Sequence, residues 1–282
     1  MSIFLVKAPA KVNLFLHITG KRIDQHHYLE SLFVFVNVYD LLEVNIGGRR
    51  NGVYFSNFKI SKYNNTVYKA IELLLKHSSV RPNISVNVIK NILVSAGLAG
   101  GSADAAAIIR LLGNMWNVDY KLLQDLALKV GSDVPACLES KTLFAKGVGE
   151  DILLLPDLLL PRYIILVAPR GKSLSTAKVF NHYKCDNFST SIGDKLPVKQ
   201  DDWMELIYNS KNDLLDVALS FIPEIEEILF VLKKLKNVFI ARMTGSGATC
   251  FALFNELSHA ENAAKYLQMT RPDWIVFNAK IL

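Results

Sequence analysis

Cysteine is scarce in this chain of 282 residues. Its three cysteines, Cys137, Cys185 and Cys250, lie far apart and form no Cys-x-x-Cys pair. This excludes a small disulfide-stapled scaffold and is typical of a protein from a reducing compartment. The histidines show no metal-ligand spacing such as His-x-His, so the sequence does not indicate a zinc site.

Long hydrophobic runs are also missing. The most apolar stretch, residues 152–168, is broken by two prolines and two charged residues, whereas a membrane span needs about 20 apolar residues. Near the N-terminus, Lys7 interrupts a short apolar run that no basic segment precedes, which is unlike a signal or transit peptide. We therefore expect a cytoplasmic protein that does not bind a membrane.

Basic tracts are absent although the chain is basic. Lysine and arginine total 32 against 26 acidic residues, a formal charge of +6, and 51% of the residues are hydrophobic. That hydrophobic fraction excludes intrinsic disorder. The basic residues are scattered and are not interleaved with aromatics, so no nucleic-acid partner is expected. A phosphorylated small molecule fits the charge better.

Two common nucleotide-binding signatures are incomplete. Residues 171–173 read Gly-Lys-Ser like the end of a P-loop, but Leu166 stands where its first glycine is required. Residues 245–247 read Gly-Ser-Gly, but Cys250 stands where a dinucleotide fingerprint has its third glycine. Walker and Rossmann mechanisms are therefore both disfavoured.

The strongest motif present is a glycine-rich loop at residues 97–101, followed by an Ala-, Ile- and Leu-rich helix predicted from Ser102 to Leu112. Glycine lets the backbone approach an anion closely, and a helix N-terminus presents unpaired N–H groups to it. Ser102 could cap this helix or offer its hydroxyl to Mg²⁺. The alternative is an ordinary glycine-rich turn into a core helix.

A second motif, Pro-Ala-Lys-Val-Asn-Leu, occupies residues 9–14. Lys11 and Asn13 lie two apart and share one face of a predicted strand, opposite apolar residues. We expect them to line a surface or cleft, although a lone strand lysine is usually just solvated.

Two further motifs each leave an alternative open. In Gly-Ser-Asp-Val-Pro at residues 131–135, Asp133 is either the N-cap of a helix or a carboxylate that accepts a proton from a substrate hydroxyl. The Gly-Ser-Gly turn within residues 243–249 is either a plain hairpin or a second contact for phosphate or substrate.

The remaining pattern predicts an α+β protein with a domain boundary in the proline-containing, Leu-rich turn at residues 151–161 and a polar loop at 185–200. Short apolar, β-branched runs predict strands at residues 3–8, 12–18, 32–38, 84–88, 163–168, 238–243, 249–254 and 274–279. Helical periodicity predicts helices at residues 64–75, 102–112, 120–130, 175–183, 223–235 and 258–267.

In this order and spacing, the four motifs resemble those of the GHMP kinase superfamily. The matching segments are PAKVNLFLHITGKRIDQHHYLESLF at 9–33, AGLAGGSADAA at 96–106, VGSDVPACL at 130–138 and MTGSGATCF at 243–251. The first is the most specific, and its extended form is similar to that of members acting on a cytidine diphosphate derivative. The resemblance implies a two-domain α+β kinase with its active site between the domains. Residues 1–158 would form a ribosomal-protein-S5-like domain and residues 159–282 a ferredoxin-like one.

The resemblance also implies roles for individual residues. Asp133 would be the general base, and Lys11 would hold Asp133 and the hydroxyl in place. Asn65 and Lys90 would contact the nucleotide of ATP, whose phosphates and Mg²⁺ would be held by Leu93, Val94, Ser95, Ala96, Gly97, Leu98, Ala99, Gly100, Gly101, Ser102 and Ala103. The substrate would be recognised by Asn13, His26, His27 and Phe180. A monomer or weak homodimer is expected.

Four positions depart from the family pattern. Residues 24–27 read Asp-Gln-His-His where Asp-Gly-Tyr-His is usual, Leu93 replaces a proline, and Ala99 replaces a glycine. Ala99 therefore predicts an ordinary φ or mild strain. The alternatives are another GHMP small-molecule kinase, of homoserine or mevalonate type, and a non-catalytic binding protein on the same fold.

Overall fold

The structure is a computed structural model that describes residues 2–24, 26–56, 65–79, 81–184 and 187–282. Gln25, Cys185 and the predicted helix start at residue 64 lie outside these ranges. Within them, no helix is both long and apolar enough to cross a membrane.

Two compact units make up the chain, and they are interleaved along the sequence. Unit 1 comprises Met1–Lys11, Val38–Val94 and Ala99–Ser140, and unit 2 comprises Val12–Asn37, Ser95–Leu98 and Lys141–Leu282. The units alternate along the sequence rather than follow one another. The single boundary expected near residue 158 stays a prediction.

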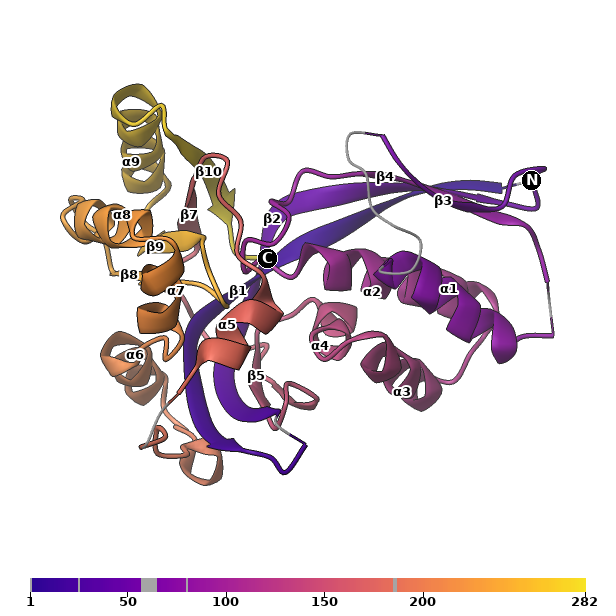
Figure 1. Cartoon of the computed structure of the whole chain (residues 1–282), viewed down its shortest axis with the longest axis horizontal. Helices are drawn as coiled ribbons and strands as arrows, with labels where there is room; N and C mark the ends of the chain where they lie inside the picture. Colours follow the sequence, from indigo (N-terminus) through magenta and orange to yellow (C-terminus); the bar gives the residue numbers. More distant parts are fainter. Residues whose placement is uncertain (1, 25, 57–64, 80, 185–186) are drawn as a thin grey trace. The chain divides into compact units, whose positions relative to one another are not determined.

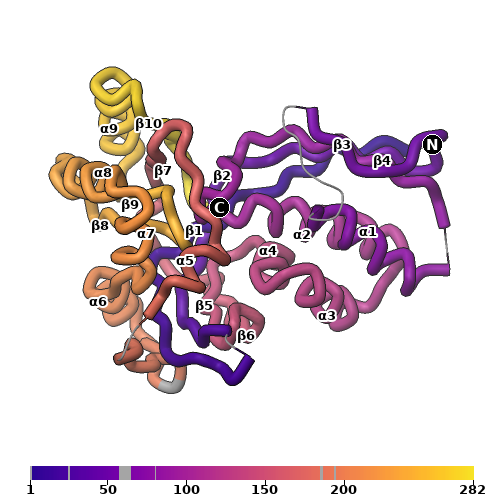
Figure 2. The backbone as a smooth tube through the Cα atoms, viewed as in Figure 1, coloured from indigo at the N-terminus to yellow at the C-terminus, as the bar shows by residue number. Residues whose placement is uncertain are grey.

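Two long strands run through both units. β1 (Ser2–Lys21) joins two predicted strands into one, and β2 (His27–Ile46) extends the strand predicted at 32–38 in both directions. The two strands pair with each other (Figure 2). From residue 8 to residue 18 every position of β1 is buried, so this stretch lacks the exposed face that simple alternation predicts.

In unit 1, a small sheet is covered by packed helices (Figure 1). β2 pairs antiparallel with β4 (Ile84–Ile89), which pairs parallel with β3 (Gly52–Phe55), a strand the sequence pattern missed. The helices are α1 (Thr66–Lys76), α2 (Gly100–Met115), α3 (Tyr120–Val130) and α4 (Val134–Glu139).

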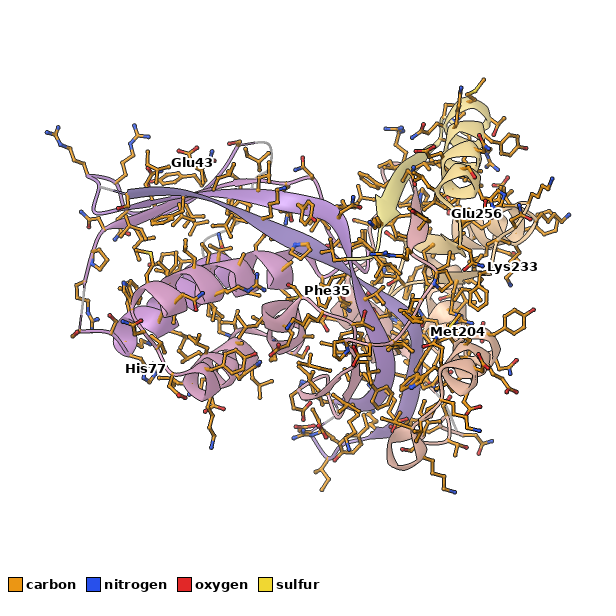
Figure 3. The ribbon with its side chains drawn as sticks, turned by 180° about the vertical axis from the view of Figure 1, so that it is seen from behind. Phe35, Glu43, His77, Met204, Lys233 and Glu256 are labelled. Carbon is orange, nitrogen blue, oxygen red and sulfur yellow. The ribbon has the colours of Figure 1, made fainter. Side chains whose placement is uncertain are left out.

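Two helices of unit 1, α1 and α3, begin directly after a side chain that caps them. The Asn65 side chain accepts a hydrogen bond from the Tyr68 N–H at 3.1 Å, and Asp119 caps α3 in the same way. α3 spans the predicted residues, whereas α2 begins two residues earlier than predicted. α1 ends where His77 caps it (Figure 3).

Unit 2 contains a second part of the first sheet. β2 pairs with β5 (Leu143–Lys146), and β5 pairs with β6 (Asp151–Leu154), both antiparallel. β6 is a strand that the sequence pattern missed, at the start of the segment 151–161 in which a Leu-rich turn is predicted. Phe35 of β2, which Figure 3 labels, is among the largest fully buried side chains.

The four-stranded sheet of unit 2 has the order β10-β7-β9-β8, with every neighbouring pair antiparallel. Its strands are β7 (Tyr163–Pro169), β8 (Ile240–Met243), β9 (Cys250–Phe254) and β10 (Trp274–Lys280). α8 (Glu224–Lys233) and α9 (Leu257–Thr270) pack against it. This is the order of a ferredoxin-like fold, which confirms the expected architecture.

The remaining elements of unit 2 are short helices. α5 (Thr176–His182) lies within the helix predicted at 175–183, and the Ser175 side chain caps it. α6 (Gln200–Asn209) and α7 (Leu215–Phe221) were not predicted, and each buries few apolar side chains. The predicted loop at 185–200 includes a 3₁₀ turn, η2 (Gly193–Lys195), and ends where α6 begins.

Candidate active site

Lys11 and Asp133 form an ion pair within unit 1. The Lys11 Nζ lies 3.3 Å from the Asp133 Oδ2, and the Asp133 side chain is 34% exposed. Lys11 and Asn13 are only 4% and 1% exposed, so neither is solvated on a surface, and their place in a cleft stays a prediction. Because an isolated charge is costly to bury, the Asp133 carboxylate is the natural partner for the Lys11 ammonium.

Asp133 stands at the N-cap position of α4, but its side chain makes no capping hydrogen bond. Its backbone carbonyl accepts the Cys137 N–H at 3.0 Å, while its carboxylate faces Lys11. The capping alternative therefore does not explain this aspartate. A partly exposed carboxylate beside a buried ammonium is an arrangement that can take a proton from a bound hydroxyl.

Arg110 of α2 holds the other end of α4. Its guanidinium donates to the carbonyls of Cys137 at 2.8 Å and Leu138 at 2.7 Å, and to the Ser140 hydroxyl at 3.0 Å. These bonds occupy the last carbonyls of α4 and so fix the helix that carries Asp133. Sequence reasoning missed Arg110, although an arginine inside a run of Ala, Ile and Leu is a usable signal.

The glycine-rich segment in unit 1 leads into an uncapped helix. Ala99 is the N-cap of α2 in the left-handed conformation, with φ 52° and ψ 30°, so the strained alternative is the one observed. Ser102 is the third helical residue, so it is not the cap. The first turn of α2 has neither a side-chain cap nor an acidic residue. Its N–H groups and positive dipole end are therefore suited to an anion.

The backbone segments around Gly97 and Gly245 pack closely against each other within unit 2. A Cβ at Gly97, where φ is +78°, would lie 2.4 Å from the Thr244 carbonyl oxygen. A Cβ at Gly245 would lie 2.7 Å from the Gly97 carbonyl oxygen. The two glycine motifs are thus packed backbone against backbone, and close packing, rather than anion approach, explains these two glycines.

The turn between β8 and β9 is a hairpin held by side chains from elsewhere in unit 2. The Asn212 Nδ2 donates to the carbonyls of Met243 and Gly245, each at 2.9 Å. The Asn13 backbone N–H donates to the Thr244 Oγ1 at 2.8 Å, and its side chain donates to the Ser31 hydroxyl at 2.8 Å. Asn13 therefore connects β1 to this turn.

Unit 2 also brings together two of the four predicted substrate residues. The rings of His27 and Phe180 lie 5.7 Å apart, and Tyr183 meets His27 edge-on at 5.5 Å. Burial, with Lys21 and His26 nearby, lowers the pKa of His27, which favours its neutral form. The His26 ring is 71% exposed and pairs with Asp24. Sequence reasoning missed Tyr183.

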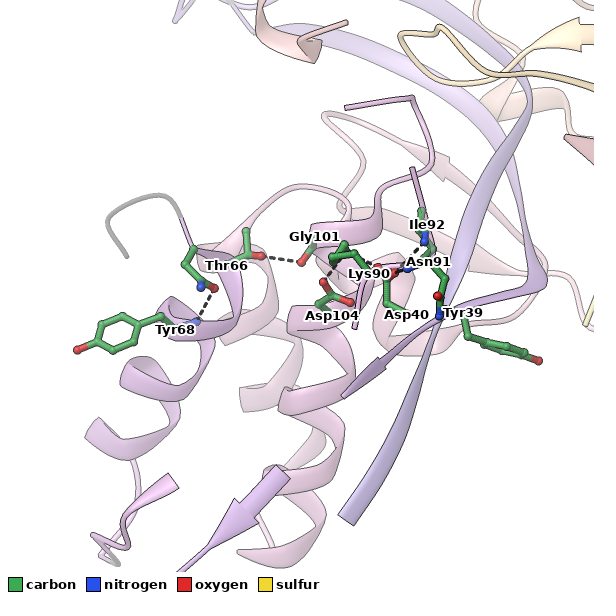
Figure 4. A network of polar contacts seen from close by, with 10 residues as sticks. Tyr39, Asp40, Thr66, Tyr68, Lys90, Asn91, Ile92, Gly101 and Asp104 are labelled. Atoms are coloured by element: carbon green, nitrogen blue, oxygen red, sulfur yellow. Dashed lines mark hydrogen bonds and ion pairs between the residues drawn. The ribbon is translucent and has the colours of Figure 1, made fainter. Parts of the chain in front are cut away.

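Lys90 lies between two carboxylates of unit 1. Its ammonium contacts the Asp40 Oδ2, and it lies 2.7 Å from the Asp104 Oδ2 (Figure 4). Asn65 caps α1. The first residue of that helix, Thr66, donates its hydroxyl hydrogen to the Gly101 carbonyl at 2.7 Å. The nucleotide contacts expected of Asn65 and Lys90 stay predictions.

No group of three or more His, Cys, Asp or Glu side chains in the described ranges could hold a metal ion. Mg²⁺ commonly binds through substrate phosphates and few protein ligands. The hydroxyl of Ser102, in the uncapped first turn of α2, is compatible with that mode.

Comparison with known proteins defines the class. Residues 65–141 match the model for the N-terminal domain of GHMP kinases, and residues 199–270 match the model for their C-terminal domain. The chain is a small-molecule kinase of the GHMP class, as its motifs predicted.

The relatives define the family within that class. A 4-diphosphocytidyl-2-C-methyl-D-erythritol kinase of Ehrlichia canis is 95% identical over the full length of both chains. The kinase of the same name from Anaplasma marginale is 48% identical and aligns over 100% of this chain and 98% of its own. A crystal structure of 4-(cytidine 5'-diphospho)-2C-methyl-D-erythritol kinase matches with a TM-score of 0.80, 28% identity and 99% coverage of both chains. The chain therefore belongs to the 4-diphosphocytidyl-2-C-methyl-D-erythritol kinases.

Proposed function

We propose that this chain transfers the γ-phosphoryl group of ATP to the 2-hydroxyl of 4-diphosphocytidyl-2-C-methyl-D-erythritol, a step of the non-mevalonate isoprenoid pathway. The observation that carries the proposal is the Lys11–Asp133 pair, whose Nζ and Oδ2 atoms lie 3.3 Å apart. The names of relatives up to 95% identical over the whole chain support the choice of substrate.

Asp133 accepts the proton of the 2-hydroxyl as its oxygen attacks the γ-phosphorus. The bond from the γ-phosphorus to the bridging oxygen breaks, and ADP leaves. Lys11 keeps the carboxylate and the hydroxyl in place and offsets negative charge during the transfer. Positioning and charge stabilisation are the main requirements of phosphoryl transfer, so few side chains suffice.

Residues 93–103, from here on called the phosphate loop, would hold the ATP phosphates. The uncapped start of α2 supports this role, because its N–H groups have no side-chain acceptor. Ser102 would contact Mg²⁺, which when bound neutralises phosphate charge. Asn65 and the chain around Lys90 would meet the rest of the nucleotide.

The cytidine end of the substrate would be recognised in unit 2. His27 and Phe180 already form a ring pair, which supports stacking on a cytosine. Asn13 and His26 are the other proposed contacts, and the exposed ring of His26 is accessible to a ligand. We further propose that the chain works in the cytoplasm as a monomer or weak homodimer.

Release of ADP by the purified chain tests the proposed substrate. ATP and Mg²⁺ are supplied with 4-diphosphocytidyl-2-C-methyl-D-erythritol, homoserine, mevalonate or galactose, each in a separate reaction. We expect turnover with the first acceptor at least about 100-fold above the others, measured as kcat/KM. Equal turnover of another acceptor, or no turnover of the first, would refute the proposal.

Asp133→Asn tests the proposed base. The amide keeps the shape but cannot take the proton, so we expect kcat to fall by about 10²–10⁴-fold. Binding of ATP, measured by calorimetry, should stay within about twofold, because Asp133 acts on the acceptor. Asp125→Asn, which alters an exposed carboxylate of α3 in the same unit, is the matched control and should keep full activity. Full activity of the Asp133 variant would remove that residue from the role.

A further inference from the structure

Three charged side chains are buried together in unit 1, although burying charges carries a large desolvation penalty. Lys90 is 6% exposed, Asp40 of β2 is 0% exposed and Asp104 of α2 is 3% exposed, measured on their side chains. The Lys90 ammonium contacts both carboxylates (Figure 4). None of the proposed catalytic steps uses Asp40 or Asp104.

Asp40 fixes the chain just before the phosphate loop. Its Oδ1 accepts the backbone N–H groups of Asn91 at 2.6 Å and Ile92 at 2.8 Å. The Asn91 side chain adds a bond to the Tyr39 carbonyl at 2.9 Å. One carboxylate therefore binds two successive amides and, through its other oxygen, the Lys90 ammonium.

The same cluster meets the residues at the far end of the loop. Asp104 lies in the second turn of α2, and its Oδ2 is 2.7 Å from the Lys90 Nζ. At Gly100, the first residue of α2, an added Cβ would lie 3.2 Å from the Lys90 Nζ and 3.3 Å from the Asp40 Oδ2. The helix start thus packs directly on the cluster, and a side chain at this position would push its atoms aside by a few tenths of an ångström.

We propose that Asp40, Lys90 and Asp104 form a clamp that positions both ends of the phosphate loop for ATP. Lys90 acts on the nucleotide through the loop and not by direct contact of its ammonium with phosphate. Holding the loop ends in one arrangement before ATP arrives lowers the entropic penalty of binding. The clamp rests on the proposed function in one respect, that ATP binds this loop, and it does not depend on which alcohol is phosphorylated.

A double-mutant cycle between Asp40→Asn and Lys90→Met tests the clamp in the full chain. A non-hydrolysable ATP analogue with Mg²⁺ is titrated by calorimetry without acceptor, and kcat and KM for ATP are measured with acceptor. We expect each single change to weaken nucleotide binding by about tenfold, with a smaller effect on kcat. The double variant should bind the ATP analogue no more weakly than whichever single variant binds it more weakly, because either single change already breaks the clamp.

Two further variants separate positioning from mere stability. Asp104→Asn keeps the size of the side chain and one acceptor for Lys90, so it should fold and weaken nucleotide binding by about threefold. Asp119→Ala removes the N-cap of α3 in the same unit, so it should lower the melting temperature without changing nucleotide binding. Should Lys90→Met prevent folding, the cycle is repeated between Asp40→Asn and Asp104→Asn, with the same non-additive result expected.

Three results would overturn the clamp. The first is nucleotide binding unchanged in Asp40→Asn. The second is the same loss from Lys90→Met in the Asp40→Asn background as in the wild type, which would mean that the ammonium contacts the nucleotide itself. The third is a wild-type chain that does not bind nucleotide, which would refute the proposed function as well. A wild type that binds the analogue but does not phosphorylate the proposed acceptor refutes only the acceptor, and the cycle then still supports or refutes the clamp.

Discussion

At the scale of single residues, three cationic side chains are explained by the partners they find. Lys11 is paired with Asp133, and Lys90 lies between Asp40 and Asp104. Arg242 of β8 instead donates to backbone carbonyls, among them that of Leu14 at 2.5 Å. The side chains of Lys11 and Lys90 are buried, so neither adds to a basic surface for a partner.

His17 of β1 provides a residue-scale prediction. Burial lowers its pKa from 6.5, Asp213 and Glu30 oppose that shift, and Lys211 and Arg242 add to it. Because the folded pKa lies below the unfolded value, the stability contribution is complete above about pH 6.5 and is lost as pH falls toward the folded pKa. Lowering the pH from about 7.5 to about 5.5 should therefore reduce the free energy of unfolding more in the wild type than in His17→Gln, as measured by chemical denaturation at each pH.

His77→Gln is the matched control for that comparison, because His77 is exposed at the end of α1. The free energy of unfolding of His77→Gln should vary with pH as that of the wild type does. If His17→Gln loses as much stability as the wild type over the same range, the His17 side chain does not account for the effect.

Which site residues could be read from the sequence is also a residue-scale question. The fold brings Lys11 into contact with Asp133, and His27 into contact with Phe180, while the roles that the sequence suggests for them stay predictions. The burial of Lys11 and Asn13 was not predictable from strand alternation, because β1 is covered on both faces. Asp40 and Arg110 were missed because their partners lie far away in sequence, Arg110 facing carbonyls 27 and 28 residues on.

At the scale of elements, helices with clear caps and periodicity were predictable, whereas short strands were not. α3 was predicted residue for residue, with Asp119 at its cap. β5 and β6 have four residues each, and they form only because they pair with neighbours that the local pattern does not specify.

The contact between the two glycine motifs gives an element-scale prediction. Gly97→Ala combines a positive φ with a Cβ placed 2.4 Å from the Thr244 carbonyl oxygen. Gly171→Ala is the matched control, because its φ of +73° is similar and no atom lies within 4 Å of an added Cβ.

We expect Gly171→Ala to lower the free energy of unfolding by about 1–2 kcal/mol, the cost of left-handed backbone. Gly97→Ala should lose a further 1–3 kcal/mol or more, roughly the cost of overpacking. Denaturant unfolding measures both. Equal losses in the two variants would show that the Gly97–Thr244 approach is not tight in solution.

At the scale of the whole molecule, the order of residues conceals how the chain is divided. Both β1 and β2 pass from one unit to the other, at residues 11–12 and 37–38, and residues 95–98 belong to unit 2 while their neighbours belong to unit 1. The two compact units are therefore each built from several separate segments of the sequence. The class of protein was nevertheless predictable, because the four motifs keep their order and spacing along the chain.

Nucleotide binding should stabilise the whole molecule. ATP with Mg²⁺ at about 100 times its Kd should add about 2.7 kcal/mol to the free energy of unfolding. Because Asp133 is proposed to act on the acceptor and not on ATP, Asp133→Asn should gain as much as the wild type in a thermal unfolding experiment. If ATP with Mg²⁺ stabilised the wild type but not Asp133→Asn, Asp133 would have to contribute to nucleotide binding.

The central claim, phosphorylation of one particular alcohol, is tested most directly by competition. Equimolar 4-diphosphocytidyl-2-C-methyl-D-erythritol, homoserine and mevalonate are incubated with the chain, ATP and Mg²⁺, and the products are identified by mass spectrometry and ³¹P NMR. The predicted result is one phosphorylated product, the cytidine derivative carrying a new phosphate on its 2-hydroxyl. A phosphorylated homoserine or mevalonate as the main product, or phosphate on another hydroxyl, would contradict the account.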